Sequence, residues 1–295
     1  MNVEIPVLVR GMTKMNTNKN ICIGGIDLNT NTHVRLQKSK TLNFEPYESI
    51  QLLKVYRFIG RYNTHDKSPE DFYYSTIPVE DSLETGKSID EVLDTVASKS
   101  VLDHYKHIEL DESDMIFNEN EHQNVIKNPR YEKFLPEFSM GTFKDFKIID
   151  FDWIVNSAEE SSIRVLLKDA TNRTFNLPFT DLQIYRYSDS LKKFVLKNPQ
   201  EIESFFKKDF SFCSIGLTRG FPNRCPDCNE YVYIEDNRVK KIGNPNKFGR
   251  IPDFTCSNFG TSKGCGWGFY IDGPSYRQPR HFKVRWLQLN TLLSI

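Results

Sequence analysis

Four of the six cysteines lie between residues 225 and 265, in two pairs: Cys225 with Cys228, and Cys256 with Cys265. The two residues inside the first pair let both sulfurs reach one ion, and Zn²⁺ takes four such ligands in a tetrahedron. The second pair is spaced more widely, and a disulfide or unligated buried thiols are the alternatives. Because no histidine lies within the segment, the pattern predicts a structural Zn²⁺ site with four cysteine ligands and no open position for a substrate.

The positive charge of the chain collects in the same segment. The whole chain is neutral, with 39 Lys and Arg against 39 Asp and Glu. Residues 219 to 286 hold 12 Lys and Arg against 6 Asp and Glu, a net charge of +6, so the remainder carries −6. Since a neutral chain has no overall field that attracts a polyanion, any nucleic-acid footprint has to be local.

Basic and aromatic residues alternate without an acid from residue 276 to residue 286. This pattern suits single-stranded nucleic acid, where cations meet phosphates and rings stack on bases at about 1–3 kcal/mol per base. The alternative is that Lys283 and Arg285 simply occupy the wet face of a strand. We predict single-stranded DNA or RNA as the partner, with these contact residues: Arg219, Arg224, Lys240, Lys241, Lys247, Tyr276, Arg277 and Arg280.

The rest of the chain is typical of short strands. It holds 22 Phe and 13 Tyr, a composition that favours strands over helical bundles. The candidate strands are 3–10, 21–26, 33–37, 49–59, 143–154, 162–168, 173–177, 210–218 and 282–293. Two segments predict helices: 88–107, where Ser88 and Glu91 form a capping box, and 198–208. Strands with short turns and no repeating βα units predict a mainly β fold with some helix.

Several short segments resemble the bacterial dual OB-containing domain family. They are 21–27 running into 33–36, 45–50, the turn at 65–71, 176–181, 215–219 and the closing 286–290. The resemblance implies two OB barrels joined by helical material, nucleic acid as the ligand, and a place near phage-defence or mobile-element genes. It brings no catalytic residues. The cysteine segment departs from the family pattern.

Together these observations predict four parts. A first OB-like barrel spans 1–87, and a helical and acidic connector spans 88–140. A second OB-like barrel spans 141–222 and is completed by 280–295, with a zinc ribbon inserted at 223–279. The predicted function is non-enzymatic binding of single-stranded nucleic acid, and the resemblance implies a bacterial phage-defence or mobile-element system as its setting.

Two other functions compete with this prediction. One is an adaptor that grips protein partners in a multi-protein defence assembly. The other is a divalent-metal nuclease built on His65, Asp66 and Asp71, although no recognisable catalytic motif accompanies them. The chain has no apolar run of bilayer length and no signal peptide, and its cysteines are interpreted as metal ligands, so the sequence predicts a cytoplasmic protein.

Overall fold

The chain divides into two compact units. The larger unit comprises Met1–Arg130, Leu135–Thr218 and Trp286–Ile295, and the smaller one Tyr131–Phe134 and Arg219–Arg285. The computed structural model describes residues 2–14, 21–39, 42–62, 70–83, 86–105, 108–110, 115–127, 130–131, 139–155, 161–217, 223–224, 231–232, 254–255, 268–269 and 285–295. No helix among them is both long enough and apolar enough to cross a bilayer.

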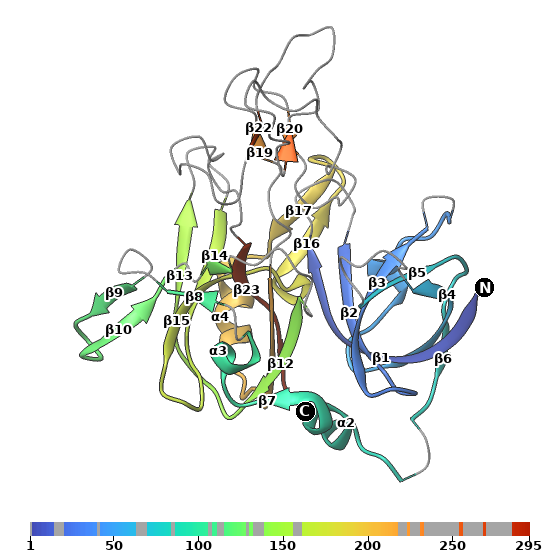
Figure 1. Ribbon diagram of the computed structural model, residues 1–295, viewed down its shortest axis with the longest axis horizontal. Helices are drawn as coiled ribbons and strands as arrows, with labels where there is room; N and C mark the ends of the chain where they lie inside the picture. Colours follow the sequence, from blue (N-terminus) through green and yellow to red (C-terminus); the bar gives the residue numbers. More distant parts are fainter. Residues whose placement is uncertain are drawn as a thin grey trace, which may run out of the picture. The chain divides into compact units, whose positions relative to one another are not determined.

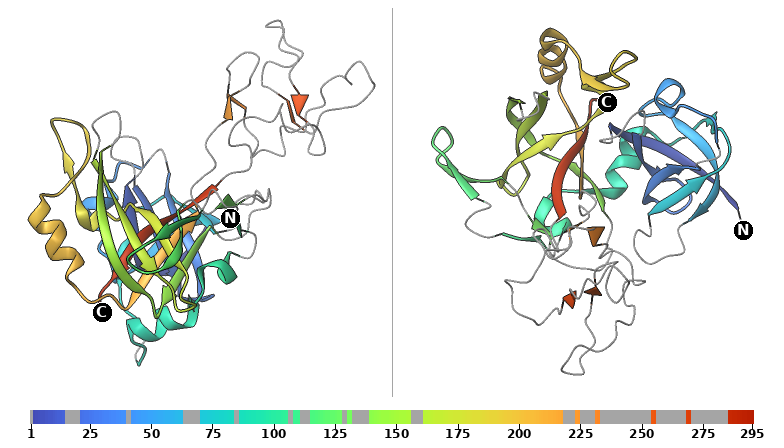
Figure 2. Two further views of the ribbon diagram at one scale, coloured as in Figure 1. Left: turned by 90° about the vertical axis from the view of Figure 1, so that its left-hand side faces the viewer. Right: turned by 90° about the horizontal axis from the view of Figure 1, so that it is seen from above.

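The first part of the larger unit is a closed five-stranded barrel, drawn in blue in Figure 1 and seen from above on the right of Figure 2. Its strands are β1 (Val3–Lys14), β2 (Ile21–Asp27), β3 (Thr32–Lys38), β4 (Val55–Tyr62) and β5 (Asp71–Tyr74). Strand β1 pairs antiparallel with both β2 and β4, and β3 runs parallel to β5. The order β1-β2-β3-β5-β4-β1 is that of an OB fold. A short strand β6 (Val79–Asp81) adds to β4.

Alternation of apolar residues explains the interior of this barrel. One face of each strand supplies a shared core, with Val7, Ile23, Val34, Phe58 and Phe72 among its buried side chains. The expected strand from residue 49 is wrong at its start, because the helix α1 (Pro46–Ser49) and a turn precede β4. Leu53 in that turn has a φ of 59°, which no strand can contain.

The first helix after this barrel begins where the sequence predicts it. Helix α2 (Ile89–Val96) carries the capping box: Glu91 N donates to Ser88 Oγ at 3.2 Å, and Ser88 N donates to Glu91 Oε2 at 2.8 Å. Strand β7 (Ala97–Ser98) and helix α3 (Val101–His104) follow. The acidic stretch then forms strands instead of a plain connection: β8 (Ile108–Glu109), β9 (Met115–Asn118), β10 (Gln123–Ile126) and β11 (Arg130–Tyr131).

A second sheet makes up most of the remainder of the larger unit. Its main path is β13-β14-β15-β23-β18-β12-β7. The bounds are β12 (Met140–Lys144), β13 (Lys147–Val155), β14 (Ser161–Lys168), β15 (Thr174–Phe179), β18 (Phe212–Leu217) and β23 (Arg285–Leu293). Strand β15 runs parallel to β23 at the pair Phe179 and Leu289, whereas β18 is antiparallel to both β23 and β12. The expected strand 143–154 breaks at Asp145, whose φ is 56°.

The connection between β15 and β18 contains four short elements. It consists of the 3-10 helix η2 (Leu182–Ile184), the hairpin of β16 (Tyr185–Ser188) and β17 (Lys193–Leu196), and helix α4 (Pro199–Phe206). The helix begins where the sequence predicts it, because the Asn198 side chain accepts from Glu201 N at 2.9 Å.

The described parts of the smaller unit are two short hairpins. Strand β19 (Asn223–Arg224) pairs with β20 (Tyr231–Val232), and β21 (Phe254–Thr255) pairs with β22 (Gly268–Phe269). The predicted zinc ligands Cys225, Cys228, Cys256 and Cys265 lie outside the described residues.

Candidate functional site

The outer face of β2 and β3, together with the loops after the first and fourth strands, is where OB barrels bind their ligands. In the first barrel of this chain that face packs against the second sheet. Arg35 Nη1 donates to Ser139 Oγ at 3.2 Å across this join. A Cβ at Gly24 would lie 3.2 Å from Met140 Sδ. The usual ligand face of the first barrel is therefore buried inside the larger unit.

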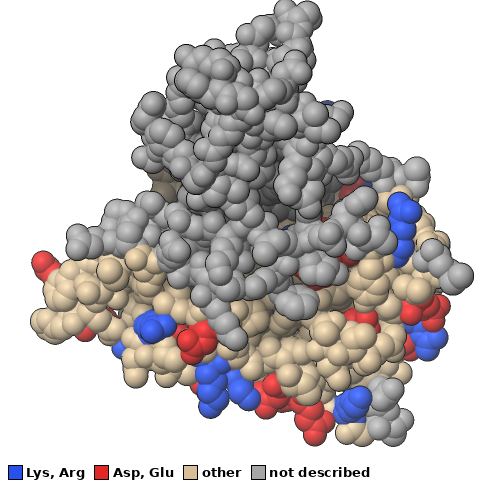
Figure 3. All heavy atoms as spheres, in the orientation of Figure 1, with Lys and Arg blue, Asp and Glu red and all other residues tan. Residues whose placement is uncertain are grey.

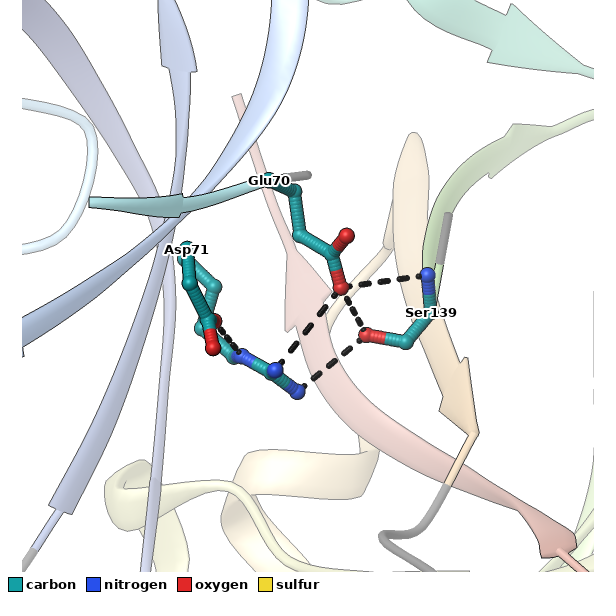
Figure 4. Close-up of polar contacts among 4 residues, drawn as sticks. Glu70, Asp71 and Ser139 are labelled. Carbon is teal, nitrogen blue, oxygen red and sulfur yellow. Dashed lines mark hydrogen bonds and ion pairs between the residues drawn. The ribbon is translucent and has the colours of Figure 1, made fainter. Parts of the chain in front are cut away.

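A buried ion-pair cluster holds the join together, and its contacts are drawn in Figure 4. Arg35 Nε donates to the Asp71 carboxylate, and Arg35 Nη2 lies 3.8 Å from Glu70 Oε1. Ser139 donates its hydroxyl to the same Glu70 oxygen at 2.5 Å. Burial opposes the charged guanidinium, but the bond to Asp71 and the two carboxylate charges outweigh it and raise the pKa of Arg35.

The cluster contains Asp71, one of the three residues predicted to form a nuclease site. Asp71 is buried, and its carboxylate is already bonded to Arg35 within the first barrel. His65 and Asp66, the other two predicted members, lie outside the described residues. Nowhere in the part of the chain that the structure describes do three or more metal-ligating side chains gather.

A second arginine, Arg10, is buried where the first barrel meets the second sheet, and no acidic residue among the described ones pairs with it. The register of β1 shifts between Val9 and Gly11, and Arg10 is the residue at this bulge. Its side chain is fully buried, and Nη1 donates to Gly141 O at 3.3 Å and to Ser214 Oγ. Nε and Nη2 have no partner among the described residues, and burial lowers the pKa of Arg10 to about 10.

Two buried histidines lie near Arg10. The rings of His33 in β3 and His104 in α3 meet edge to face, with their centroids 6.3 Å apart. Burial lowers the pKa of His33 well below its ordinary value, and the charges of Arg10 and His104 act in the same direction. Burial also lowers the pKa of His104. Both rings are therefore neutral near pH 7.

A cavity of about 480 Å³ lies beside His33 and Glu70, and we call it the mouth cavity. It lies at the start of β1, the β2–β3 turn, the end of β4 and the start of β5. Its polar lining includes Glu4, Asp27, His33, Tyr62 and Glu70. Tyr62 donates its hydroxyl to Asp27 Oδ2 at 2.5 Å, which fixes the ring at the cavity wall.

The residues predicted to bind nucleic acid cannot be assembled from the described part of the chain. Arg224 belongs to β19, and the others lie outside the described residues: Arg219, Lys240, Lys241, Lys247, Tyr276, Arg277 and Arg280. Arg10 and His33 were not predicted as site residues. The available signal was a charged or polar residue inside an otherwise apolar strand, as at Arg10 in the run 7–12.

No protein-family model matches the chain, and no curated protein sequence matches it. Among solved structures it is similar to a murine DNA-binding protein bound to double-stranded DNA, with a TM-score of 0.27 and 10% identity over 79% of this chain and 88% of that one. It is also similar to a chain of a replication protein A heterotrimer bound to single-stranded DNA, with a TM-score of 0.33 and 8% identity. That match covers 74% of this chain and 44% of the other, which is less than half its length.

Proposed function

We propose that the chain binds single-stranded nucleic acid and that the segment 218–284 supplies the contacts to its phosphates. The observation that carries this proposal is a pairing of strands. Strands β18 and β23 are antiparallel neighbours, with Leu217 opposite Leu287. The segment between them therefore leaves and re-enters the sheet at one end. It carries a net charge of +5, with 11 Lys and Arg against 6 Asp and Glu, while the whole chain is neutral.

The second sheet fits a second OB barrel. If β12 and β13 are one first strand bent at Asp145, the strand order becomes the same as in the first barrel. Helix α4 then falls between the third and fourth strands, as α1 does in the first barrel. In this arrangement the segment 218–284 is the loop between the fourth and fifth strands, one of the two loops that flank an OB ligand face.

The described surface of the second sheet supports an aromatic contact more than a basic one. Trp153 in β13 is 41% exposed and lies two residues before the end of the strand, beside the other ligand-flanking loop. Arg164 in β14 is held by bonds to Asn176 Oδ1 at 2.7 Å and Lys127 O at 3.0 Å. On the face drawn in Figure 3, basic and acidic side chains of the described residues are mixed. Because residues 219–286 carry a net charge of +6 and the remainder −6, we expect the attraction for phosphates to come from that segment.

We also propose that Cys225, Cys228, Cys256 and Cys265 hold one Zn²⁺ that orders this segment. The two short hairpins support this: the first cysteine pair falls between β19 and β20, and the second between β21 and β22. Two hairpin turns that each supply two cysteines form the ligand set of a zinc ribbon. With four thiolates the ion is closed to substrate, so its contribution is structural.

Fluorescence anisotropy with labelled single strands of DNA and RNA tests the proposal. We expect binding at about 50 mM salt that weakens steeply as the salt concentration rises, because bound phosphates release counterions. The double variant Arg277→Glu with Arg280→Glu should weaken binding of all sequences about equally. The matched control is the double variant Lys207→Glu with Lys208→Glu, which makes the same change in charge at two exposed residues after α4. This variant should bind nucleic acid as tightly as the natural chain.

Failure to bind any single strand at about 50 mM salt would overturn this proposal. Stable co-purification with a protein partner, combined with indifference to nucleic acid, would favour the adaptor instead. Equal losses in the two double variants would show that only the total charge matters and that no specific surface is involved.

A further inference from the structure

We propose that the outer edge of β9 binds an extended segment of a protein partner, one whose apolar residues are flanked by Lys or Arg. The hairpin of β9 and β10 projects from the second sheet, on the left of Figure 1 and again in the right-hand view of Figure 2. Strand β10 pairs with β15 on one side and with β9 on the other, and the structure describes no strand beyond β9. That edge therefore presents backbone N–H and C=O groups with which an added strand can pair.

The hairpin is anchored on the side that faces the sheet. Val125 and Ile126 of β10 are buried and pair in parallel with Thr174 and Phe175 of β15. The Thr174 hydroxyl donates to Gln123 Oε1 at 3.1 Å. Since β9 is already in place as a strand, a segment that binds to it orders only itself, which keeps the entropic cost of binding low.

Strand β9 lacks the features that block other sheet edges of this chain. Strand β13 has a bulge between Ile148 and Asp150, and Asp150 is charged and exposed. The short strand β6 directly follows Pro78, which has no N–H to donate. The four residues of β9 include no charge and no proline, and Ile116 and Phe117 are 41% and 59% exposed. Because successive side chains of a strand point to opposite faces, an added strand would find apolar contacts on both faces.

The charge around β9 selects the partner. Residues 109–121 contain six Asp and Glu and no Lys or Arg, a net charge of −6. Glu119 lies exposed in the turn directly after β9. A second copy of the chain would bring the same negative charge to the edge, and a nucleic acid would bring phosphates, so both are disfavoured. A segment with Lys or Arg on either side of its apolar residues is complementary.

Fluorescence anisotropy of the full chain, freed of nucleic acid, tests the proposal with a labelled peptide, Lys-Lys-Val-Thr-Ile-Thr-Val-Lys-Lys. We expect it to saturate one site with a dissociation constant of about 100 μM or tighter. Lys-Lys-Pro-Pro-Pro-Pro-Pro-Lys-Lys has the same charge but no central N–H, and Glu-Glu-Val-Thr-Ile-Thr-Val-Glu-Glu has the opposite charge. Each should bind at least about tenfold more weakly.

The double variant Ile116→Lys with Phe117→Lys adds two charges to the edge and should weaken binding of the first peptide at least about tenfold. The matched control is Ile77→Lys with Val79→Lys, which makes the same change in charge at two exposed apolar residues of the first barrel, 57% and 67% exposed. It should leave the affinity unchanged. If a thermal melt shows that the first variant unfolds, the pair Phe117→Lys and Val79→Lys replaces the two double variants with the same expectations.

The proposal is overturned if the first peptide does not saturate, if the proline peptide binds equally well, or if the folded β9 variant binds as tightly as its control. Sedimentation velocity of the chain alone tests the second copy as the occupant. A dimer that the β9 variant loses and the control keeps would show that β9 pairs with itself, which also overturns the proposal. None of these measurements depends on nucleic-acid binding, so this proposal and the proposed function can fail separately.

Discussion

Arg10 and Arg35 are both buried where the first barrel meets the second sheet, but their surroundings differ. Arg35 lies between Asp71 and Glu70, whereas Arg10 bonds only neutral oxygens and leaves two donors unpartnered among the described residues. Removing one member of a buried ion pair strands the other charge, while replacing a buried unpaired charge with an apolar group costs little. The two arginines should therefore respond in opposite ways to the same substitution.

We predict that Arg35→Met lowers the free energy of unfolding by about 3–5 kcal/mol, because Glu70 and Asp71 lose their counter-charge. Arg10→Met should change it by less than about 1 kcal/mol or raise it, because the charge is removed together with its desolvation cost. Urea unfolding followed by fluorescence measures both. A large loss in Arg10→Met would show that this arginine has a partner that the described residues do not include.

The buried carboxyl of Asp181 makes the free energy of unfolding depend on pH. It is fully buried and accepts from Gln183 N at 2.9 Å, Gln183 Nε2 at 2.9 Å and Leu292 N at 3.2 Å. Burial nevertheless raises the pKa of Asp181 to about 7. Between about pH 4 and pH 7 the folded carboxyl keeps its proton while the unfolded one has lost it. The contribution of Asp181 to the free energy of unfolding is therefore fully present below about pH 4 and is lost as the pH rises toward 7.

The comparison that isolates this effect is the natural chain against Asp181→Asn. The free energy of unfolding of the natural chain should fall relative to the variant between about pH 4 and pH 7, by no more than about 4 kcal/mol. Denaturant titrations across that range measure the difference. A difference that stays constant with pH would contradict the raised pKa.

At the scale of elements, local chemistry made the helix starts predictable. The capping box at Ser88 was expected from residue type and spacing and is confirmed, and helix α4 lies within the expected helical segment 198–208. The expected strands 21–26 and 33–37 are also confirmed and pair as the hairpin of β2 with β3. The expected strands 162–168 and 173–177 pair in the same way, as β14 with β15. Strand ends that depend on single backbone angles, at Leu53 and Asp145, were not predictable, because nothing in the apolar pattern announces a positive φ.

Gly60 in β4 provides a test of how tightly the first barrel closes. A Cβ there would lie 2.1 Å from Tyr73 O, a backbone atom of the neighbouring strand that cannot turn away. We predict that Gly60→Ala lowers the free energy of unfolding by about 1–3 kcal/mol or more. Gly24→Ala is the control, since the nearest atom to its Cβ is Sδ of the flexible Met140 side chain at 3.2 Å, and Arg10 Nη2 lies at 3.9 Å. Chemical denaturation of both variants should separate them, and equal losses would contradict this explanation.

At the scale of the whole molecule, the sequence predicted the class of fold but not how its parts pack. A mainly β chain with a closed OB-type barrel is confirmed by the strand pairing. The boundaries at 87, 140, 222 and 279 stay predictions, as do the second barrel and the zinc ligands. The burial of the first barrel's ligand face could not be predicted. It depends on contacts between residues more than a hundred positions apart, such as Arg10 with Gly141.

Zinc binding is a property of the whole chain that can be measured directly. We predict one Zn²⁺ per chain by elemental analysis of reduced protein. The metal should be lost in Cys225→Ser with Cys228→Ser and kept in Cys22→Ser, which changes a cysteine of β2 outside the predicted ligand set. The double variant should also bind single strands more weakly, because the basic segment loses its order. Metal-free natural protein would refute the zinc site.

The most direct test of the nucleic-acid proposal is to find where a single strand touches the chain. A strand substituted with bromodeoxyuridine can be cross-linked by ultraviolet light, and the attached peptides can be identified by mass spectrometry. The proposed arrangement predicts cross-links within residues 219–286 and near Trp153, at the end of β13. Cross-links confined to the first barrel, whose usual ligand face is buried, would contradict it.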